Sequence, residues 1–190
     1  MASSEITIAS NALQLLGADP INSFASSEGK HAKLAGRLWP QVRDSLIRVY
    51  AGPCVRKRVL LAPESEAPEF DWDYSFMLPG DWVRTLQVGE RGERISFESA
   101  GRKILADTSS LPLVYVWSNT DPAQWDPALC DAACLEMAAR MAYAVTQSAS
   151  LSELKRTEAN KALKLAKSLA LRLPPCSLEK RSMACAISPQ

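Results

Sequence analysis

The chain offers few side chains that could carry out catalysis or bind a metal. It has one histidine, His31, so any Ser-His-Asp or Cys-His arrangement would depend on that residue. Cys130 and Cys134 are four residues apart and could face one metal ion from a helix, but a zinc site needs about four ligands and no second close pair of Cys or His accompanies them. No glycine-rich nucleotide-binding motif is present. We therefore expect a protein that is not an enzyme, with no catalytic residue, no metal and no cofactor, in which both cysteines are small packing residues.

Five carboxylates lie close together in the middle of the chain, where paired acids could perform acid-base catalysis or bind divalent cations. They are Glu64, Glu66, Glu69, Asp71 and Asp73. Prolines lie among them, and their spacing does not match a glycine-anchored calcium loop. We interpret this segment as a solvated acidic loop.

Charge is unevenly distributed around this loop. Residues 30–58 carry eight basic side chains and one acid, whereas residues 59–81 carry six acids and no base. Three interpretations stay open: pairing between the two segments within one chain, a basic surface for nucleic acid, or complementary flanks through which copies associate head to tail into a ring. On the third interpretation the candidate ring-interface charges are Arg37, Arg43, Arg48, Glu64, Glu66 and Glu69.

These residues must be positioned by helices in the first third of the chain. Apolar residues at helical spacing predict one helix over about 4–16, ending at Gly17. A second predicted helix extends to about residue 50, with a kink or break at Pro40, because proline removes one helical hydrogen bond. Its apolar stripe comprises Ala32, Ala35, Trp39, Val42, Leu46 and Val49.

The middle of the chain loses the helical period. Residues 82–88 alternate as a strand would, and 95–98 and 103–105 flank a plausible hairpin turn at Ala100-Gly101. Residues 113–117 are bulky on both faces, which predicts a buried strand. We expect one small antiparallel sheet of about three to five strands, inserted over about 72–117.

The last third returns to helix. Asp126-Pro127 opens an alanine-rich segment that we expect to be the most buried helix. Ser150 and Glu153 stand at capping-box spacing before a helix that reaches about residue 173. Its predicted core face comprises Ala159, Ala162, Ala166, Leu169 and Leu173. Pro174-Pro175 ends this helix, and residues 176–190 have no clear period. The expected architecture is one α+β domain over 1–173, mainly a helical bundle (about 4–50 and 126–173) with an inserted sheet, and an extended C-terminal tail over 174–190.

The totals exclude several classes of protein. Hydrophobic residues make up 47% and charged residues 23% of the chain, which is ordinary for a globular domain. A net charge of +1 gives no global field toward nucleic acid or membrane. No apolar run approaches the roughly 20 residues needed to span a bilayer, so we expect no membrane partner.

Several short motifs occur in a distinctive order. They are A-L-x-x-L-G at 12–17, R-D-x-L-I-R at 43–48, Y-S-F-M-L-P-x-D at 74–81, I-L-A-D at 104–107, L-V-Y-V at 113–116 and W-D-P at 125–127. In order and spacing, over roughly residues 5–170, they resemble the head-to-tail connector adaptors of tailed bacteriophages, the tail tubular protein A family. Tyr50-Ala51-Gly52-Pro53 departs from that family's H-P-W-x-F segment, and the tail after Pro174 matches none of its motifs.

The resemblance implies structural work in a virion. Members of this family form a homo-oligomeric ring of about twelve copies under the portal, which lengthens the DNA channel and presents a platform to the next tail component. By analogy, residues 5–50 and 126–173 would form the ring wall, 72–117 would project toward the tail, and 174–190 would dock on the portal. The candidate portal-docking residues are Leu178, Lys180, Arg181, Met183 and Ile187.

The partners implied by the resemblance are the portal protein, a downstream tail or nozzle protein, and genomic DNA that passes through without sequence-specific binding. The implied location is the portal–tail junction of the virion, with the host cytoplasm during assembly. Two alternatives stay open: a tail-completion or head-closure protein, and a small DNA-binding packaging accessory protein that uses residues 30–58.

Overall fold

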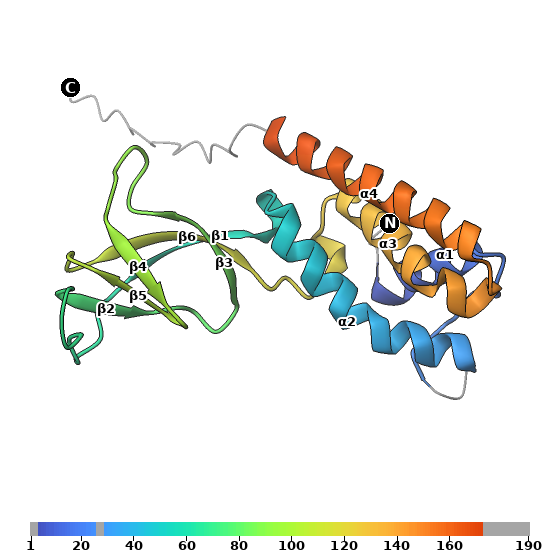
Figure 1. The fold of residues 1–190 in the computed structure, drawn as a ribbon, viewed down its shortest axis with the longest axis horizontal. Coiled ribbons are helices and arrows are strands. Elements are labelled where there is room, and N and C mark those ends of the chain that lie inside the picture. Colours follow the sequence, from blue (N-terminus) through green and yellow to red (C-terminus); the bar gives the residue numbers. More distant parts are fainter. Residues whose placement is uncertain (1–3, 26–28, 173–190) are drawn as a thin grey trace, which may run out of the picture.

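The computed structural model describes residues 4–25 and 29–172, which form a helical half and a β half (Figure 1). Helices α1 (Glu5–Gln14) and α2 (Lys30–Tyr50) come before the strands, and α3 (Pro127–Thr146) and α4 (Ala149–Arg172) come after them. The strands are β1 (Arg56–Leu61), β2 (Tyr74–Met77), β3 (Trp82–Val88), β4 (Phe97–Ala100), β5 (Lys103–Ala106) and β6 (Leu111–Trp117). The α+β class, with the β region inserted between helices, is confirmed.

The N-terminal helices have clear local causes. Helix α1 begins after Ser4, whose hydroxyl accepts a hydrogen bond from the Thr7 N–H at 3.1 Å. The chain leaves it through Gly17, whose φ of +75° favours glycine. Helix α2 shows no break at Pro40, because its apolar stripe packs on both sides of the missing hydrogen bond and the proline itself faces solvent. Val49, expected in that stripe, is exposed.

Helix α3 lies at the centre of the helical half and packs against α1, α2 and α4. Asp126 caps it by accepting from the Ala128 N–H at 2.9 Å, and Pro127 occupies the first turn. Its small side chains let the neighbouring helices approach closely, and most of its residues with apolar side chains are buried. Just before α3, Trp125 stacks on Trp39 of α2, with ring centroids 5.9 Å apart.

Helix α4 differs from the sequence-based expectation at its start and on its core face. Its cap is Ser148, whose hydroxyl accepts from the Leu151 N–H at 3.3 Å, so Ser150 lies within the first turn. Ala159 and Ala166 are buried as expected, but Leu169 is 42% exposed. The apolar residues of α4 occupy more than one face, so helical spacing alone could not decide which face packs on α3.

The β half contains two three-stranded antiparallel sheets, so the expectation of one sheet was wrong. The strand order is β1-β6-β3 in one and β2-β5-β4 in the other, and the β4–β5 hairpin turns at Gly101 as predicted. The β region also begins at Arg56 instead of about residue 72. Strand β1 is an edge strand with alternate exposed residues, and its three successive basic side chains hide the strand pattern.

Each sheet contributes to a hydrophobic core. Phe76, Leu78, Ile104, Leu111 and Leu113 are the main members of a core within the β half. The central strand β6 also sends Val116 into the core of the helical half. Burial on both faces of β6 agrees with the expectation for 113–117.

The chain crosses between the two halves twice, and Asn119 ties the crossings together. Asn119 is 1% exposed. Its Nδ2 donates to the Cys54 carbonyl at 3.0 Å, and its Oδ1 accepts from the Asp121 N–H at 3.1 Å. Its own carbonyl accepts from the Trp125 indole N–H at 3.2 Å. The buried amide of Asn119 therefore hydrogen-bonds to backbone groups in both connections, the one from α2 to β1 and the one from β6 to α3. These bonds hold the β half against the helical half.

Candidate interaction surfaces

The exposed side of α2 carries a basic stripe, which we define as Lys30, Lys33, Arg37 and Arg48. Their spacings of three, four and eleven residues bring them to one side of the helix, opposite the buried stripe that contains Trp39. All four are exposed, and within residues 4–25 and 29–172 none has an ion pair. Arg43 lies off this stripe and pairs with Asp44 at 2.8 Å.

The acidic loop, residues 62–73, is held at its base by hydrogen bonds to strand β2. The Glu64 N–H donates to the Ser75 carbonyl at 2.8 Å. The Glu64 carboxylate receives Lys103 at 2.7 Å and the Ser75 hydroxyl at 2.7 Å. These two hydrogen bonds lower the pKa of Glu64. Glu64 is therefore a residue that anchors the loop.

The far end of the same loop is also anchored, but its tip faces solvent. The Trp72 indole donates to Glu98 at 3.2 Å, and the Asp73 N–H donates to the Asp107 carboxylate at 3.0 Å. Between the anchors the Trp72 N–H bonds to the Phe70 carbonyl at 2.9 Å, closing a tight turn around Asp71 at φ +68°. Phe70 is 74% exposed. The loop thus presents an aromatic ring among free carboxylates.

A mixed cluster on the β1-β6-β3 sheet uses one basic and one acidic residue from the two charged segments. Lys57 donates to the Asp81 carboxylate at 2.6 Å and lies 3.7 Å from the centre of the Trp117 ring. The Tyr115 hydroxyl donates to the other Asp81 oxygen at 3.0 Å. Burial alone would raise the pKa of Asp81, but the hydrogen bonds from Lys57 and Tyr115 outweigh it and lower that pKa. Burial and the bond to Asp81 raise the pKa of Tyr115 to about 12.

Among the described residues, ion pairs therefore use Lys57, Asp81, Arg43 and Glu64, and most other charges of the two segments have no ion pair there. Among the six candidate ring-interface charges, Arg37, Arg48, Glu66 and Glu69 are exposed and Arg43 and Glu64 have partners. The basic stripe and the acidic loop lie on different halves, so the structure does not bring them together (Figure 1). The candidate portal-docking residues lie outside the described part of the chain.

Cys130 and Cys134 lie on α3, whereas His31 lies on α2. Cys130 is buried on α3, with its sulfur 3.7 Å from the Pro122 carbonyl oxygen, and Cys134 is half-buried. Burial, reinforced by Asp131, raises the pKa of Cys134 to about 11, so its thiol stays protonated. Within the described residues no three His, Cys, Asp or Glu side chains could share a metal ion. His31 lies near the start of α2, half-exposed.

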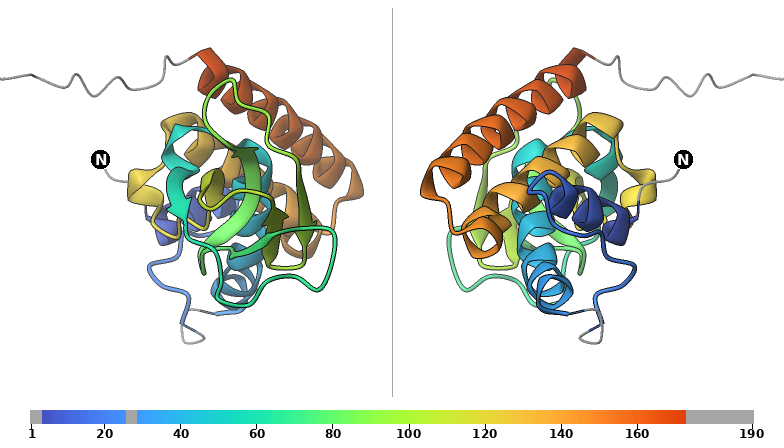
Figure 2. Two further views of the ribbon diagram at one scale, coloured as in Figure 1. Left: turned by 90° about the vertical axis from the view of Figure 1, so that its left-hand side faces the viewer. Right: turned by 90° about the vertical axis from the view of Figure 1, so that its right-hand side faces the viewer.

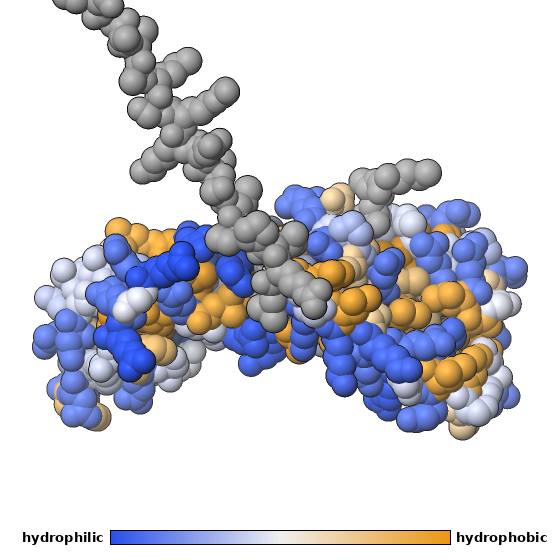
Figure 3. All heavy atoms as spheres, turned by 90° about the horizontal axis from the view of Figure 1, so that it is seen from above, coloured by the Kyte–Doolittle hydropathy of each residue, from blue (hydrophilic) through white to orange (hydrophobic). Residues whose placement is uncertain are grey.

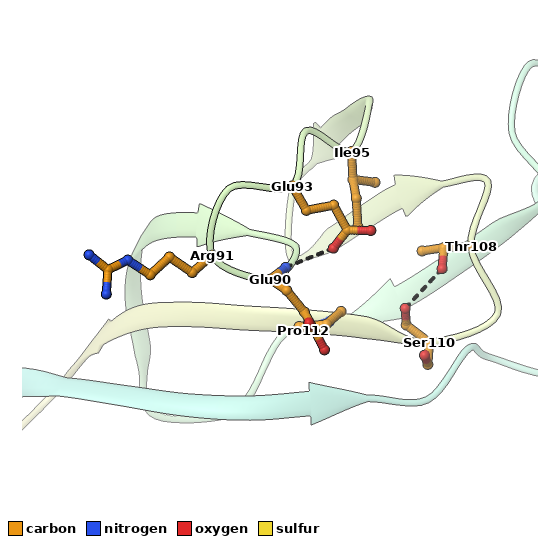
Figure 4. Close-up of a pocket in the computed structure, with 7 residues that line it drawn as sticks. All are labelled: Glu90, Arg91, Glu93, Ile95, Thr108, Ser110 and Pro112. Atoms are coloured by element: carbon orange, nitrogen blue, oxygen red, sulfur yellow. Dashed lines mark hydrogen bonds between the residues drawn. The ribbon is translucent and has the colours of Figure 1, made fainter. Parts of the chain in front are cut away.

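One open depression lies at the end of the β half (Figure 4). It has a volume of about 280 Å³ between the loop after β3 and the turn before β6. The Glu93 carboxylate accepts from the Glu90 N–H at 2.8 Å, the Glu90 side chain extends toward Pro112, and Arg91 points away. The lining offers no nucleophile with an adjacent base.

Sequence reasoning missed two apolar features that the structure exposes. Phe70 was passed over within a run of acids, and α4 leaves Leu154 and Leu165 on its outer side. Two features of the sequence could have indicated these exposed residues: an aromatic residue between two acids in a proline-rich loop, and leucines outside the core stripe of α4.

No helix among the described residues is both long enough and apolar enough to cross a bilayer. Neither a scan against models of known protein families nor a search of curated proteins finds a match for this chain.

Proposed function

We propose that this chain is a ring-forming adaptor that joins the portal of a tailed bacteriophage to its tail, at the portal–tail junction of the virion. The ordered motifs between residues 5 and 170 suggest the family. The main observation in support is the two-ended shape, in which a β half projects from a helical half (Figure 1). The helical half exposes the basic stripe of α2, and the β half exposes the acidic loop. A subunit that must contact one partner above and another below needs such separate ends.

The rigid link between the halves supports this role. A connector has to hold its two platforms in a fixed relation. Asn119 joins the two crossings of the chain, and the Trp39–Trp125 stack holds the segment before α3 against α2. In the proposed ring the helical half builds the wall, the β half faces the downstream tail or nozzle protein, and residues 174–190 dock on the portal. DNA passes through the channel without sequence-specific contacts.

The proposal is tested by mixing the full-length protein with its cognate portal and imaging the complexes by electron microscopy, with mass analysis to count copies. A matched sample is truncated after Leu173. We expect the full-length protein to add one ring of about twelve copies to the portal and the truncated protein to add none. If neither binds under conditions in which capsids assemble, the adaptor role is refuted, and a tail-completion or head-closure role becomes the better proposal.

A DNA-binding accessory role is the second candidate, because the basic stripe of α2 is exposed and unpaired within the described residues. Four cations on one side of a helix can contact successive phosphates. The measurement is binding to duplex DNA over a salt series. A true binder of this kind loses affinity with a log–log slope of about −3 to −4, since the slope is about −0.9 for each phosphate contact. An absent or shallow dependence excludes this role and leaves the adaptor proposal intact.

A further inference from the structure

The outer side of α4 carries an apolar stripe, which we define as Leu154, Leu165 and Leu169. These leucines are 53%, 59% and 42% exposed. Spacings of eleven and four residues place them on one side of the helix over about 22 Å of its length. The core side of α4, with Ala159 and Ala166, packs on α3, so the stripe belongs to a different face. Helix α4 lies at the edge of the bundle (Figure 2).

Two cations flank the apolar stripe. Lys161 and Lys164 are exposed, and in the described residues neither has an ion pair, whereas Arg156 lies on the opposite side of the helix. On the described part of the chain, an ion pair joins Lys155 to Glu158 at 2.9 Å and compensates the charge of that glutamate. Seen from above, apolar residues interrupt the hydrophilic surface of the helical half (Figure 3). A partner that fits this face must therefore bring an apolar group surrounded by negative charge.

The acidic loop has that chemistry. Phe70 is largely exposed, and Glu66, Glu69, Asp71 and Asp73 surround it in sequence without ion pairs among the described residues. The loop is anchored at both ends by Glu64 and Trp72, so little ordering is needed when it binds. An aromatic side chain on a preorganised loop is the usual central anchor of an interface.

The two surfaces cannot meet within one molecule. Figure 1 shows the acidic loop at the end of the β half that is remote from the bundle, while α4 belongs to the helical half. A contact between them has to join two copies, and because the surfaces differ it is head-to-tail. Such contacts close into a ring when the rotation between copies allows.

We infer that the acidic loop of one copy docks on α4 of the next, with Phe70 seated on the apolar stripe and the loop carboxylates facing Lys161 and Lys164. The inference rests on the proposed ring and names the contact that builds it. It assigns the cationic side of that contact to α4 instead of the basic stripe of α2. Two copies of the chain should therefore bind each other through this contact in the absence of the portal.

The test is sedimentation velocity of the full-length chain from about 1 μM to about 1 mM, at low and moderate salt. We expect concentration-dependent association that weakens as salt rises. Phe70→Ser and Leu165→Ser should each weaken association about tenfold or more, which matches the removal of one buried anchor. Leu60→Ser is the matched control, because Leu60 is 66% exposed on β1 and lies outside both surfaces, and its association should equal wild type.

Mixing the two weakened variants gives a sharper readout. Phe70→Ser keeps an intact α4 face and Leu165→Ser keeps an intact loop, so one good contact can form per pair. The mixture should therefore restore dimers and nothing larger. A wild-type chain that stays monomeric throughout, variants that associate as wild type, or a Leu60→Ser effect of the same size each overturns the inference.

Failure of this contact is distinguishable from failure of the adaptor role. Both variants are added to the cognate portal and imaged beside wild type. Rings formed equally well by Phe70→Ser and Leu165→Ser refute the loop–α4 contact and leave the adaptor role standing. A wild-type protein that adds nothing to the portal, yet self-associates through Phe70, refutes the adaptor role and leaves the contact.

Discussion

Replacing Asn119 with alanine should loosen the joint between the two halves, and the magnitude follows from what the side chain contacts. The Cys54 carbonyl loses its donor at 3.0 Å from a side chain that is 1% exposed, which costs about 1–3 kcal/mol. The Asp121 N–H also loses its acceptor, but Asp121 is exposed and can bond to water, so this loss costs about 0.5–1 kcal/mol. We expect Asn119→Ala to lower the free energy of unfolding by about 1.5–4 kcal/mol.

The assay is urea unfolding followed in parallel by circular dichroism at 222 nm, which reports the helices, and by tryptophan fluorescence. In the wild type the two transitions should coincide, and in Asn119→Ala they should separate as the halves uncouple. Asn119→Asp keeps the acceptor but sets a carboxylate against the Cys54 carbonyl, so it should be at least as destabilising. The control is Asn160→Ala on the exposed side of α4. A free energy for Asn119→Ala within about 0.5 kcal/mol of wild type would refute the reasoning.

Three further predictions concern local contacts. Gly52→Ala should lower the free energy of unfolding by about 1–3 kcal/mol in urea, because its Cβ would collide with the Tyr50 ring, whereas Gly80→Ala, with no atom within 4 Å of the new Cβ, should match wild type. The lowered pKa of Asp81 means that its folded pKa lies below its unfolded one, so its contribution is present above about pH 4 and is lost as the pH falls through the folded value. Urea unfolding at stepped acidic pH should therefore show a steeper loss for wild type than for Asp81→Asn, and equal slopes contradict the assignment. Cys134, with a pKa of about 11, should react with iodoacetamide at pH 8 about a hundredfold more slowly than in urea-unfolded protein, as read by peptide mass spectrometry.

The helical half was largely predictable from sequence because its signals are local. The ends of α1, α2 and α3 were predicted to within a few residues. The signals were the 3.6-residue period of apolar residues, Gly17 after α1 and the Asp126-Pro127 pair before α3. The expected break at Pro40 does not occur, because the rule for isolated helices ignores packing, and in α2 packing dominates. The two sheets were not predictable, since which strands pair depends on contacts between residues far apart in sequence.

The candidate surfaces were predictable in charge but not in geometry. Counting residues identified the basic and acidic segments, yet it could not separate Glu64, which anchors its loop, from Glu66, which faces solvent. Nor could it show that Leu169 leaves the core, because α4 carries apolar residues on two faces and the fold chooses between them. Exposure is a property of the tertiary packing, so surfaces made from apolar residues appear only with the structure.

The hydrogen bond from Asn119 to Cys54 joins residues 65 positions apart, and this has a consequence for the order of folding. Bringing α1 and α2 to α3 and α4 across a flexible connection of that length costs about 4 kcal/mol of chain entropy. The pairing of β1 with β6 closes a connection of similar length, so the step that brings these two strands together meets most of this cost and leaves the two chain crossings side by side. The helices then meet as if they were joined by a short loop, and substitutions in β6 should slow folding more than they speed unfolding.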